Sequence, residues 1–413
     1  MHNSNFILYK NASDWTYAAS IASTWVWAPA LFVASSKAFL TGATGFLWFL
    51  IPNVLTLVLF AVIATYASSG FSLTDVISKA GKPQVYLHGV MSIALLLGST
   101  AVQLTGLYTL VAEWFSLSKA TTSIAISCVA LAMVYSGGLK SCIRTDLVKY
   151  IILLVCGLLL AGNAVSTGTF NGFSGYLEPT FMQETLAFGI TTAIGLFTAP
   201  YVDQTFWQRV HSIERKRIVP IFCKAALLFA LVPIMFGTVG FFSTGDAAWS
   251  IATATEGVWS CVLGIGVFAA LLSTLDSNLC SISAFTWNKD KNDASNVNLS
   301  RLAMIGLLLV SNILFISTDY SITQWFLLYG TLRTCAFVPT VLIIFDRYDA
   351  KRLFIGTLIA AVVATIGYAV YAGTSTAFLF TLFGLFFPLV GYKPKYLLTI
   401  RGFECKGDLC AHL

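Results

Sequence analysis

The sequence predicts an all-α integral membrane protein of about twelve transmembrane helices. Apolar residues make up 57% of its 413 residues and charged residues only 10%, whereas a water-soluble domain carries roughly 25% charged residues. Apolar runs of about 20 residues, long enough to cross a hydrocarbon layer of ~30 Å, follow one another along most of the chain. The Lys and Arg residues are concentrated in every second segment between these apolar runs. This composition leaves no room for a separate water-soluble domain.

The order of the apolar runs predicts one transmembrane domain over residues 1–391 and a cytoplasmic tail over 392–413. The N-terminus is short and polar, with no small-residue cleavage site after an apolar core, so no signal peptide is expected. The predicted spans are 15–38, 42–67, 84–112, 119–136, 143–166, 183–203, 218–242, 257–286, 300–317, 321–345, 351–372 and 375–391.

The Lys and Arg residues predict the orientation of the chain. Of the 24, 21 lie on the side that also holds both termini, Lys37 and Lys119 lie on the other side, and Arg333 falls within a span. Because cytoplasmic loops are rich in Lys and Arg, both termini are predicted to be cytoplasmic, in a plasma or inner membrane. The net charge of +6 thus reports topology and gives no reason to expect a nucleic-acid partner.

Two spans contain signals for a break in the middle of the membrane. Small and polar residues fill 19–25 before Ala28-Pro29, and a similar stretch, 191–198, precedes Ala199-Pro200. Broken helices expose backbone dipoles to a cavity, as transporters require. The pattern matches two five-helix repeats of opposite topology, about 15–166 and 183–345, followed by two extra helices in 351–391. Gly and Pro are common in membrane helices in any case, so one matched pair could also arise by chance.

The span 257–286 contains the run Ser273-Thr274-Leu275-Asp276-Ser277. Paired hydroxyls within a helix can simply bond to the carbonyl four residues earlier. A carboxylate within the membrane costs several kcal/mol, so Asp276 must face a cavity, a partner or a cation. Hydroxyl and carbonyl oxygens are the ligands that hard cations prefer.

Four segments together resemble the sodium:solute symporter family, and they span most of the chain. They are 19–25, 135–140 with Thr145-Asp146, 203–209 and 273–277. The resemblance implies a leucine-transporter-type inverted-repeat fold and Na⁺-coupled symport by alternating access. The stretches 203–209 and 23–28 look most like the urea-permease-like branch. Two features depart from the family. The sequence begins about fourteen residues before the first span, without the helix that usually precedes it, so that helix is either dispensable in this branch or removed by truncation. Ile21 stands where some relatives have Asp.

The resemblance also implies cation sites. The main Na⁺ site would use backbone carbonyls of Ala19, Ala22 and Ala270 with the hydroxyls of Ser273 and Thr274. Some relatives have a second cation site or exit station, which here would involve Asp146, Asp276 and Ser277. Na⁺ is the expected coupling ion, and no other cofactor is expected.

Candidate solute-binding residues lie beside the two predicted breaks. They are Trp25, Trp27, Gln103, Phe197, Tyr201 and Arg333, with Trp325 and Tyr329 as further aromatic candidates. Aromatic residues also fill cores and interfacial belts, and Gln103 could serve an interhelical hydrogen bond instead. Arg333 could bind an anionic or carbonyl-bearing solute, or pair internally with an acid such as Asp276. The branch resemblance suggests a urea-like solute, whereas Arg333 favours one with a carboxylate.

The expected partners are a small solute and the lipid bilayer, with no nucleic acid and no obligate protein partner. Proton-coupled symport and a non-transporting solute sensor remain as alternatives. The four histidines (His2, His88, His211 and His412) lie at termini or loop edges in the predicted topology, so they offer no catalytic cluster within the membrane. An enzyme is therefore not expected.

Overall fold

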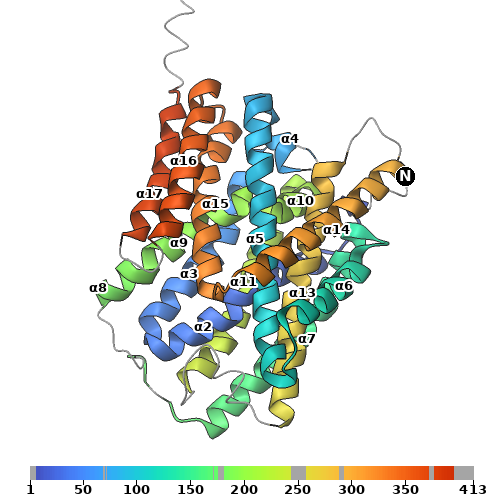
Figure 1. Ribbon diagram of the computed structural model, residues 1–413, viewed down its shortest axis with the longest axis vertical. Helices are drawn as coiled ribbons and strands as arrows, with labels where there is room; N and C mark the ends of the chain where they lie inside the picture. Colours follow the sequence, from blue (N-terminus) through green and yellow to red (C-terminus); the bar gives the residue numbers. More distant parts are fainter. Residues whose placement is uncertain are drawn as a thin grey trace, which may run out of the picture.

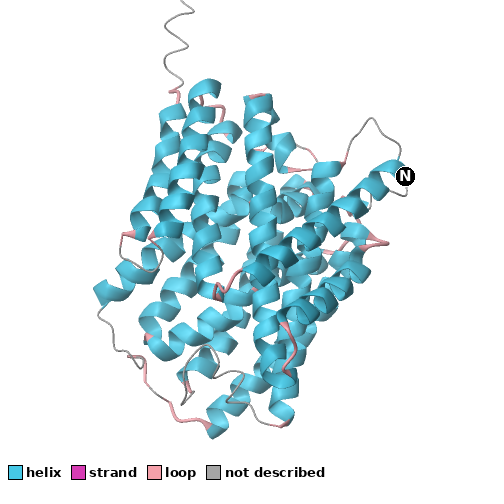
Figure 2. Ribbon diagram, in the orientation of Figure 1, coloured by secondary structure: helices cyan, strands magenta, loops and turns pink. Residues whose placement is uncertain are grey.

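The computed structural model describes residues 6–67, 70, 72–170, 172–174, 181–242, 257–287, 293–371 and 376–394. These residues form helices and connecting turns (Figure 2). One isolated bridge, between Tyr348 and Tyr392, is the only β pairing among them. Most of the predicted tail, from residue 395 on, lies outside the described residues, and the division into repeats stays a prediction.

The helices follow the predicted spans closely. Their bounds are α1 Asp14–Trp25, α2 Ala28–Leu40, α3 Gly42–Ala64, α4 Leu73–Ile77, α5 Lys82–Phe115, α6 Lys119–Val134, α7 Gly138–Thr167, α8 Phe181–Glu184, α9 Ile190–Val202, α10 Gln204–Ser212, α11 Ile218–Phe241, α13 Val258–Thr286, α14 Asp293–Ser317, α15 Ile322–Ile344, α16 Ala350–Val370 and α17 Ala377–Phe386. The short helical turns are η2 Ser78–Ala80, η3 Thr185–Gly189, η4 Arg215–Arg217 and η5 Phe387–Gly391.

Among the described residues, eight helices are long and apolar enough to cross a membrane, or nine if the bent pair α1–α2 forms one span. Three shorter apolar helices cover 119–134, 190–202 and 377–391. The chain is thus an integral, multi-pass membrane protein. The number twelve stays a prediction, because the shorter helices do not reach the length that a complete span needs.

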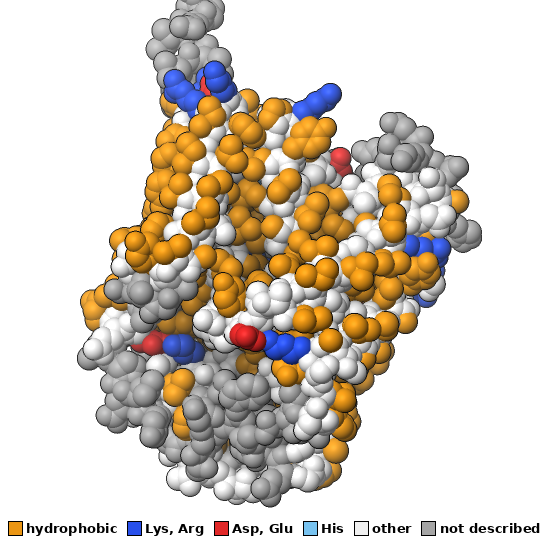
Figure 3. Space-filling model, viewed as in Figure 1, with side chains coloured by type: hydrophobic (Ala, Val, Ile, Leu, Met, Phe, Trp, Pro, Cys, Tyr) orange, Lys and Arg blue, Asp and Glu red, His pale blue; other side chains and the backbone are white. Residues whose placement is uncertain are grey.

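The outer helices present apolar stripes to the surroundings. In α3, exposed residues recur every three or four positions at Leu47, Ile51, Leu55, Leu59 and Val62. This is one face of a helix with 3.6 residues per turn. Figure 3 shows hydrophobic side chains over most of the visible face, with charged groups at few places. Such a surface is stable against lipid chains and would be unstable in water.

The first predicted break is present. Helix α1 ends at Trp25, α2 begins at Ala28, and the two axes meet at 63°. Trp27 is extended at the N-cap of α2. Pro29 lies in the first turn of α2, where a helix does not use the amide hydrogen that proline lacks. The chain therefore leaves helical geometry at Val26-Trp27, several residues after the small polar stretch.

The second break lies later than the Ala199-Pro200 pair suggests. Helix α9 continues through Pro200 to Val202, and the helical geometry ends at Asp203. The Asp203 side chain accepts a hydrogen bond from the Thr205 amide and so caps the start of α10. The cap stabilises a new helix start there, whereas the proline is tolerated inside α9.

The helices form two groups that meet around these breaks. In one group α11 packs against α1, α2 and α3, and α9 packs against α3; in the other, α13 packs against α5, α6, α7 and α14. Contacts of α1 with α7 and α13 join the groups, and α15 packs on α9. In Figure 1, α16 and α17 lie side by side at the edge next to α15. Both breaks are thereby buried at the centre of the bundle.

Candidate functional site

The end of α1 is held against the middle of α13 by hydroxyl groups. The Thr274 hydroxyl donates to the carbonyl of Val26 at 2.9 Å and lies 3.3 Å from that of Thr24. The Ser23 hydroxyl donates to the Ser273 hydroxyl at 2.6 Å. The structure therefore brings both predicted hydroxyl ligands to the break in the first span.

The three predicted carbonyl ligands are buried in the same region. Ala22 lies in the last turn of α1, where its carbonyl accepts from the Val26 amide at 2.9 Å. Ala19 lies one turn earlier in α1, and Ala270 lies one turn before Thr274 in α13. Ala19 and Ala270 lie within regular helix, so a cation bound here would share these carbonyl oxygens with helical amides. The assignment of the cation site stays a prediction.

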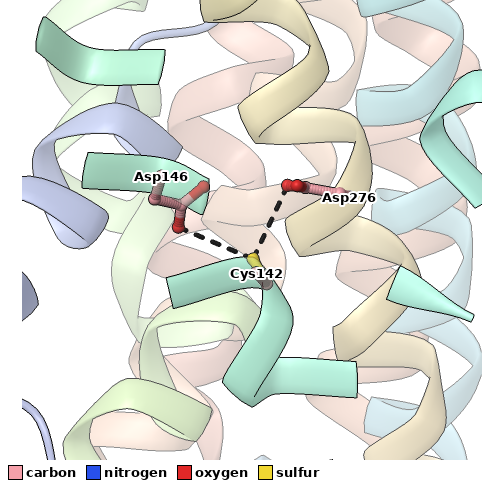
Figure 4. Close-up of side chains that lie close together, drawn as sticks. All are labelled: Cys142, Asp146 and Asp276. Atoms are coloured by element: carbon pink, nitrogen blue, oxygen red, sulfur yellow. Dashed lines mark hydrogen bonds between the residues drawn. The ribbon is translucent and has the colours of Figure 1, made fainter. Parts of the chain in front are cut away.

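The residues predicted for a second cation site form a cluster next to the first. Asp146 of α7 and Asp276 of α13 are fully buried. The Cys142 thiol lies between them, 3.5 Å from an oxygen of each (Figure 4). One ligand-type atom from each of these three residues lies within 4.8 Å of the others.

Two buried basic side chains accompany these acids. The Lys149 ammonium donates to Asp276 Oδ2 and lies 3.7 Å from Asp146 Oδ1. The Arg209 guanidinium lies 3.2 Å from Asp146 Oδ2. The prediction that both cations lie in loops is wrong, because Lys149 is 6% exposed in α7 and Arg209 is 0% exposed in α10. Lys149 follows Asp146 by three residues, the spacing of neighbours on one helix face, and this was the signal available in the sequence.

Hydroxyl groups complete the cluster. The hydroxyls of Ser273 and Ser20 each donate to Asp146 at 2.6 Å, one to each carboxylate oxygen. Arg209 Nη2 donates to Ser277 at 2.9 Å and to Thr24 at 2.5 Å. Ser273 therefore belongs to both predicted cation sites, since it contacts Ser23 of α1 and Asp146 of α7.

A second site lies between the two breaks and encloses only about 10 Å³ of free space, roughly the room of one water molecule. Side chains from both breaks and from α5, α13 and α15 close around it. The lining residues are Thr24, Trp25, Trp27, Ser99, Asp203, Thr205, Phe206, Thr274, Asn278, Tyr329 and Arg333. The predicted solute residues Trp25, Trp27 and Arg333 are thus brought together with Tyr329.

Arg333 pairs with Asp203, with 3.3 Å between Nη2 and Oδ2. The alternative pairing with Asp276 is wrong, because Asp276 contacts Lys149 instead. The guanidinium lies 3.9 Å from the ring centre of Tyr329 and 5.3 Å from that of Trp27. The buried Nε of Arg333 and Nε1 of Trp27 have no hydrogen-bond partner among the described residues. Asp203 is not among the predicted solute residues, although it begins one of the family-like segments.

The remaining predicted solute residues lie away from this space. The Gln103 side-chain oxygen accepts from the Ala28 amide at 2.9 Å and so caps α2, as an interhelical bond would. Tyr201 packs between Phe60 and Phe337. Phe197 is half-buried in α9, and its carbonyl accepts from Thr56 at 3.3 Å. None of these three lines the enclosed space. Trp25 lines it, but its indole nitrogen donates to the Asn53 carbonyl.

A larger cavity of about 340 Å³ opens near the ends of α2, α5, α14 and α15. Phe32, Thr105, Lys119, Phe315 and Ile322 are among its lining residues. Lys119 lies 2.5 Å from Asp319 at the rim, and this hydrogen bond holds the pKa of the exposed Asp319 carboxyl below its usual range. Along α15, Phe326 lies between Ile322 of this cavity and Arg333, and its ring packs on Trp27 with ring centres 5.1 Å apart.

The opposite end of the site is covered by the N-terminal segment 6–9. The Gln208 amide donates to the Ile7 carbonyl at 2.9 Å, and the Tyr9 amide donates to the Ser212 hydroxyl at 3.3 Å. The Tyr17 hydroxyl donates to the Tyr9 carbonyl. This end carries the basic residues Arg144 and Arg217 and is the end predicted to be cytoplasmic. The site is thus covered by segment 6–9 at the predicted cytoplasmic end, and the 340 Å³ cavity lies toward the opposite end.

One histidine is buried among the helices. His88 is 1% exposed within α5, where its ring nitrogens contact Gln84 and Thr340. It lies in the second turn of α5, near the start of that helix. The Thr340 hydroxyl donates to the Ala336 carbonyl of its own helix at 2.8 Å.

No family model matches the chain, and no curated protein matches it. Solved structures do. A Na⁺-coupled sialic acid symporter in a substrate-bound outward-open state superposes with a TM-score of 0.75 at 16% identity, over 95% of this chain and 92% of that one. MhsT in complex with L-phenylalanine has a TM-score of 0.59 at 15% identity, over 92% and 98%. Mhp1, a nucleobase-cation-symport-1 family transporter in a closed conformation, has a TM-score of 0.59 at 11% sequence identity, over 94% of each chain.

These similarities cover 92–95% of the chain. At such identities they establish the fold. The chain therefore has the leucine-transporter-type fold of these solved transporter structures.

Proposed function

We propose that this chain is a secondary active transporter that couples the entry of Na⁺ to the uptake of a small polar solute by alternating access. The observation that carries the proposal is the contact of Ser273 and Thr274 with the broken end of α1, directly beside the enclosed space at Arg333. An ion bound at that contact would hold α1 on α13. Thr274 belongs to the proposed ion site and also lines the enclosed space, so an ion and a solute bound there would affect one another directly.

The fold similarity supports the choice of ion. The solved symporter of highest TM-score given above is Na⁺-coupled by its description. The α1 end directs the negative end of its helix dipole at the predicted cation site. Hydroxyl and carbonyl oxygens from Ala19, Ala22, Ala270, Ser273 and Thr274 are ligands of the kind that a hard cation takes.

The charges around the enclosed space limit the solute. Asp203 and Arg333 together are neutral, so a neutral or zwitterionic solute leaves their balance intact. The two groups without partners, Nε of Arg333 and Nε1 of Trp27, are both donors, so the solute should offer an acceptor oxygen. A urea-like or amide solute meets both conditions. A carboxylate-bearing solute would meet the second, and it would have to separate Arg333 from Asp203.

The closed and hollow ends support alternating access. The segment 6–9 covers one end of the site, and the 340 Å³ cavity marks the other. In transport the helix group α1, α2, α3, α9, α10 and α11 would rock against the rest and open the covered end. The proposed membrane is a plasma or inner membrane with both termini on the cytoplasmic side.

Uptake into proteoliposomes tests the function. A panel of labelled solutes (urea, short amides, amino acids and small carboxylates) would be measured with an inward Na⁺ gradient, with an inward proton gradient and with neither. We expect one neutral, carbonyl-bearing class to accumulate only with the Na⁺ gradient. Uptake that ignores Na⁺ and follows the proton gradient would overturn the sodium assignment. Saturable Na⁺-dependent solute binding without accumulation would instead identify a sensor.

A further inference from the structure

The acid cluster at Asp146 and Asp276 has the ligand types of a cation site but already contains cations. Two fully buried carboxylates and the Cys142 thiol converge from α7 and α13 (Figure 4). Taken alone, they carry two negative charges in a space that water does not reach. A buried carboxylate needs a counter-ion, and in a chain of this fold a coupling ion could supply it.

The chain's own side chains meet this need. Lys149 contacts both acids, and Arg209 pairs with Asp146. Two negative and two positive charges make the cluster neutral. Arg209 stays ionised in any protein environment, and the Lys149 ammonium donates directly to a carboxylate. The charge that a second Na⁺ would balance is therefore already balanced.

The oxygen ligands are also occupied. Asp146 Oδ1 accepts from Ser273, and Oδ2 accepts from Ser20 and Arg209. Asp276 Oδ2 accepts from Lys149, and the Ser277 hydroxyl accepts from Arg209. A Na⁺ ion entering here would displace these bonds and would leave an unbalanced positive charge, which is costly in a dry interior.

We infer that the Lys149 ammonium is a tethered counter-ion that fills the place of a second Na⁺, so that one Na⁺ binds per transport cycle, at the α1–α13 contact. Arg209 balances Asp146 in the same way. The inference rests on the proposed function and sharpens it, because it names the residue that limits the number of coupling ions. The acids of the second cation site implied by the resemblance are then present, and the Lys149 ammonium takes the place of the ion.

Lys149→Gln is the informative substitution, since it keeps a hydrogen-bond donor of similar length and removes one charge. The cluster then carries one net negative charge, which Na⁺ can balance. In Lys149→Gln combined with Asp276→Asn the cluster is neutral again. Lys79→Gln is the matched control: Lys79 also pairs with an acid, Asp346, at 3.7 Å, but both side chains are exposed.

The experiment counts Na⁺ bound to purified full-length chain with ²²Na⁺, and records Na⁺-activation curves of uptake in proteoliposomes. We expect one bound Na⁺ in the wild-type, Lys79→Gln and doubly substituted chains, and two in Lys149→Gln, with its Hill coefficient rising from about 1 toward 2. Two ions in the wild-type chain, or one in a folded Lys149→Gln, would overturn the inference while leaving Na⁺ coupling intact. If Lys149→Gln fails to fold, the wild-type count alone decides.

A failure of the proposed function has a different signature. No ²²Na⁺ binding to the wild-type chain, together with uptake that follows protons, would refute Na⁺ coupling. In that case a gain of one Na⁺ in Lys149→Gln still supports the tethered counter-ion, and no gain overturns it.

Discussion

Arg333 of α15 and Asp203 at the start of α10 form an ion pair across the second helix break, with 3.3 Å between Nη2 and Oδ2. The guanidinium also lies over the rings of Trp27 and Tyr329, so one side chain contacts α15, α10 and the first break. A solute that binds Arg333 therefore acts on both broken helices at once. This is the arrangement that alternating access requires.

Replacing Arg333 should weaken solute binding. In Arg333→Gln the solute loses a hydrogen bond to a charged group, which is worth about 1.5–3 kcal/mol, or an increase of KM of roughly 10- to 100-fold. The measurement is solute-dependent uptake at saturating Na⁺. Arg301→Gln is the control, because Arg301 lies at the surface and donates to the Tyr135 carbonyl. An unchanged KM in Arg333→Gln would remove Arg333 from the solute site.

The hydroxyls of α13 should determine the Na⁺ requirement. Thr274→Val keeps the shape of the side chain and removes the oxygen, so we expect the Na⁺ concentration for half-maximal uptake to rise about tenfold, as for one lost hydrogen-bonding group. Ser273→Ala should act in the same direction, and Thr274→Ser should restore much of the wild-type behaviour. Ser283→Ala serves as control, since that hydroxyl bonds to the Leu279 carbonyl of its own helix. Equal Na⁺ curves for Thr274→Val and Ser283→Ala would contradict the cation assignment.

Access to the two spaces should differ between sides of the membrane. Ser36 lines the 340 Å³ cavity, whereas Ser99 lines the enclosed space. We expect Ser36→Cys to react with a membrane-impermeant thiol reagent added from outside and Ser99→Cys to be protected in this conformation. The chain without either introduced cysteine gives the background. Labelling of Ser36→Cys only from the cytoplasmic side would reverse the predicted orientation.

Packing between α11 and α2 should tolerate no added carbon at Gly240. A Cβ there would lie 2.2 Å from the Ser35 carbonyl oxygen, and backbone cannot move aside as a side chain can. Gly240→Ala should therefore destabilise the fold by about 1–3 kcal/mol, as overpacking does, seen as a lower Tm in detergent. At Gly162 in α7 a Cβ would meet nothing within 4 Å, so Gly162→Ala should leave Tm unchanged or slightly raised. Equal shifts in the two variants would argue against this helix contact.

Hydropathy and local sequence signals predicted much of the fold. The spans 42–67 and 351–372 correspond to α3 and α16, because apolar length alone defines a membrane helix. The broken first span was visible as small and polar residues before Pro29. The Ala199-Pro200 pair predicts the second break too early, because the helix continues through the proline and helical geometry ends at the Asp203 cap. A proline inside a membrane helix is tolerated when neighbouring groups satisfy the freed carbonyl.

The sequence by itself determined that the chain is helical and membrane-embedded, and it selected Ser273, Thr274, Asp276 and Arg333 as unusual, because polar groups in an apolar run are costly wherever they point. Only the tertiary structure decided their partners: Asp203 for Arg333, and Lys149 for Asp276. These pairs are separated by 130 and 127 residues. Which helix faces meet depends on the rotation and packing of every helix in the bundle. The hydropathy of the sequence does not specify this rotation and packing.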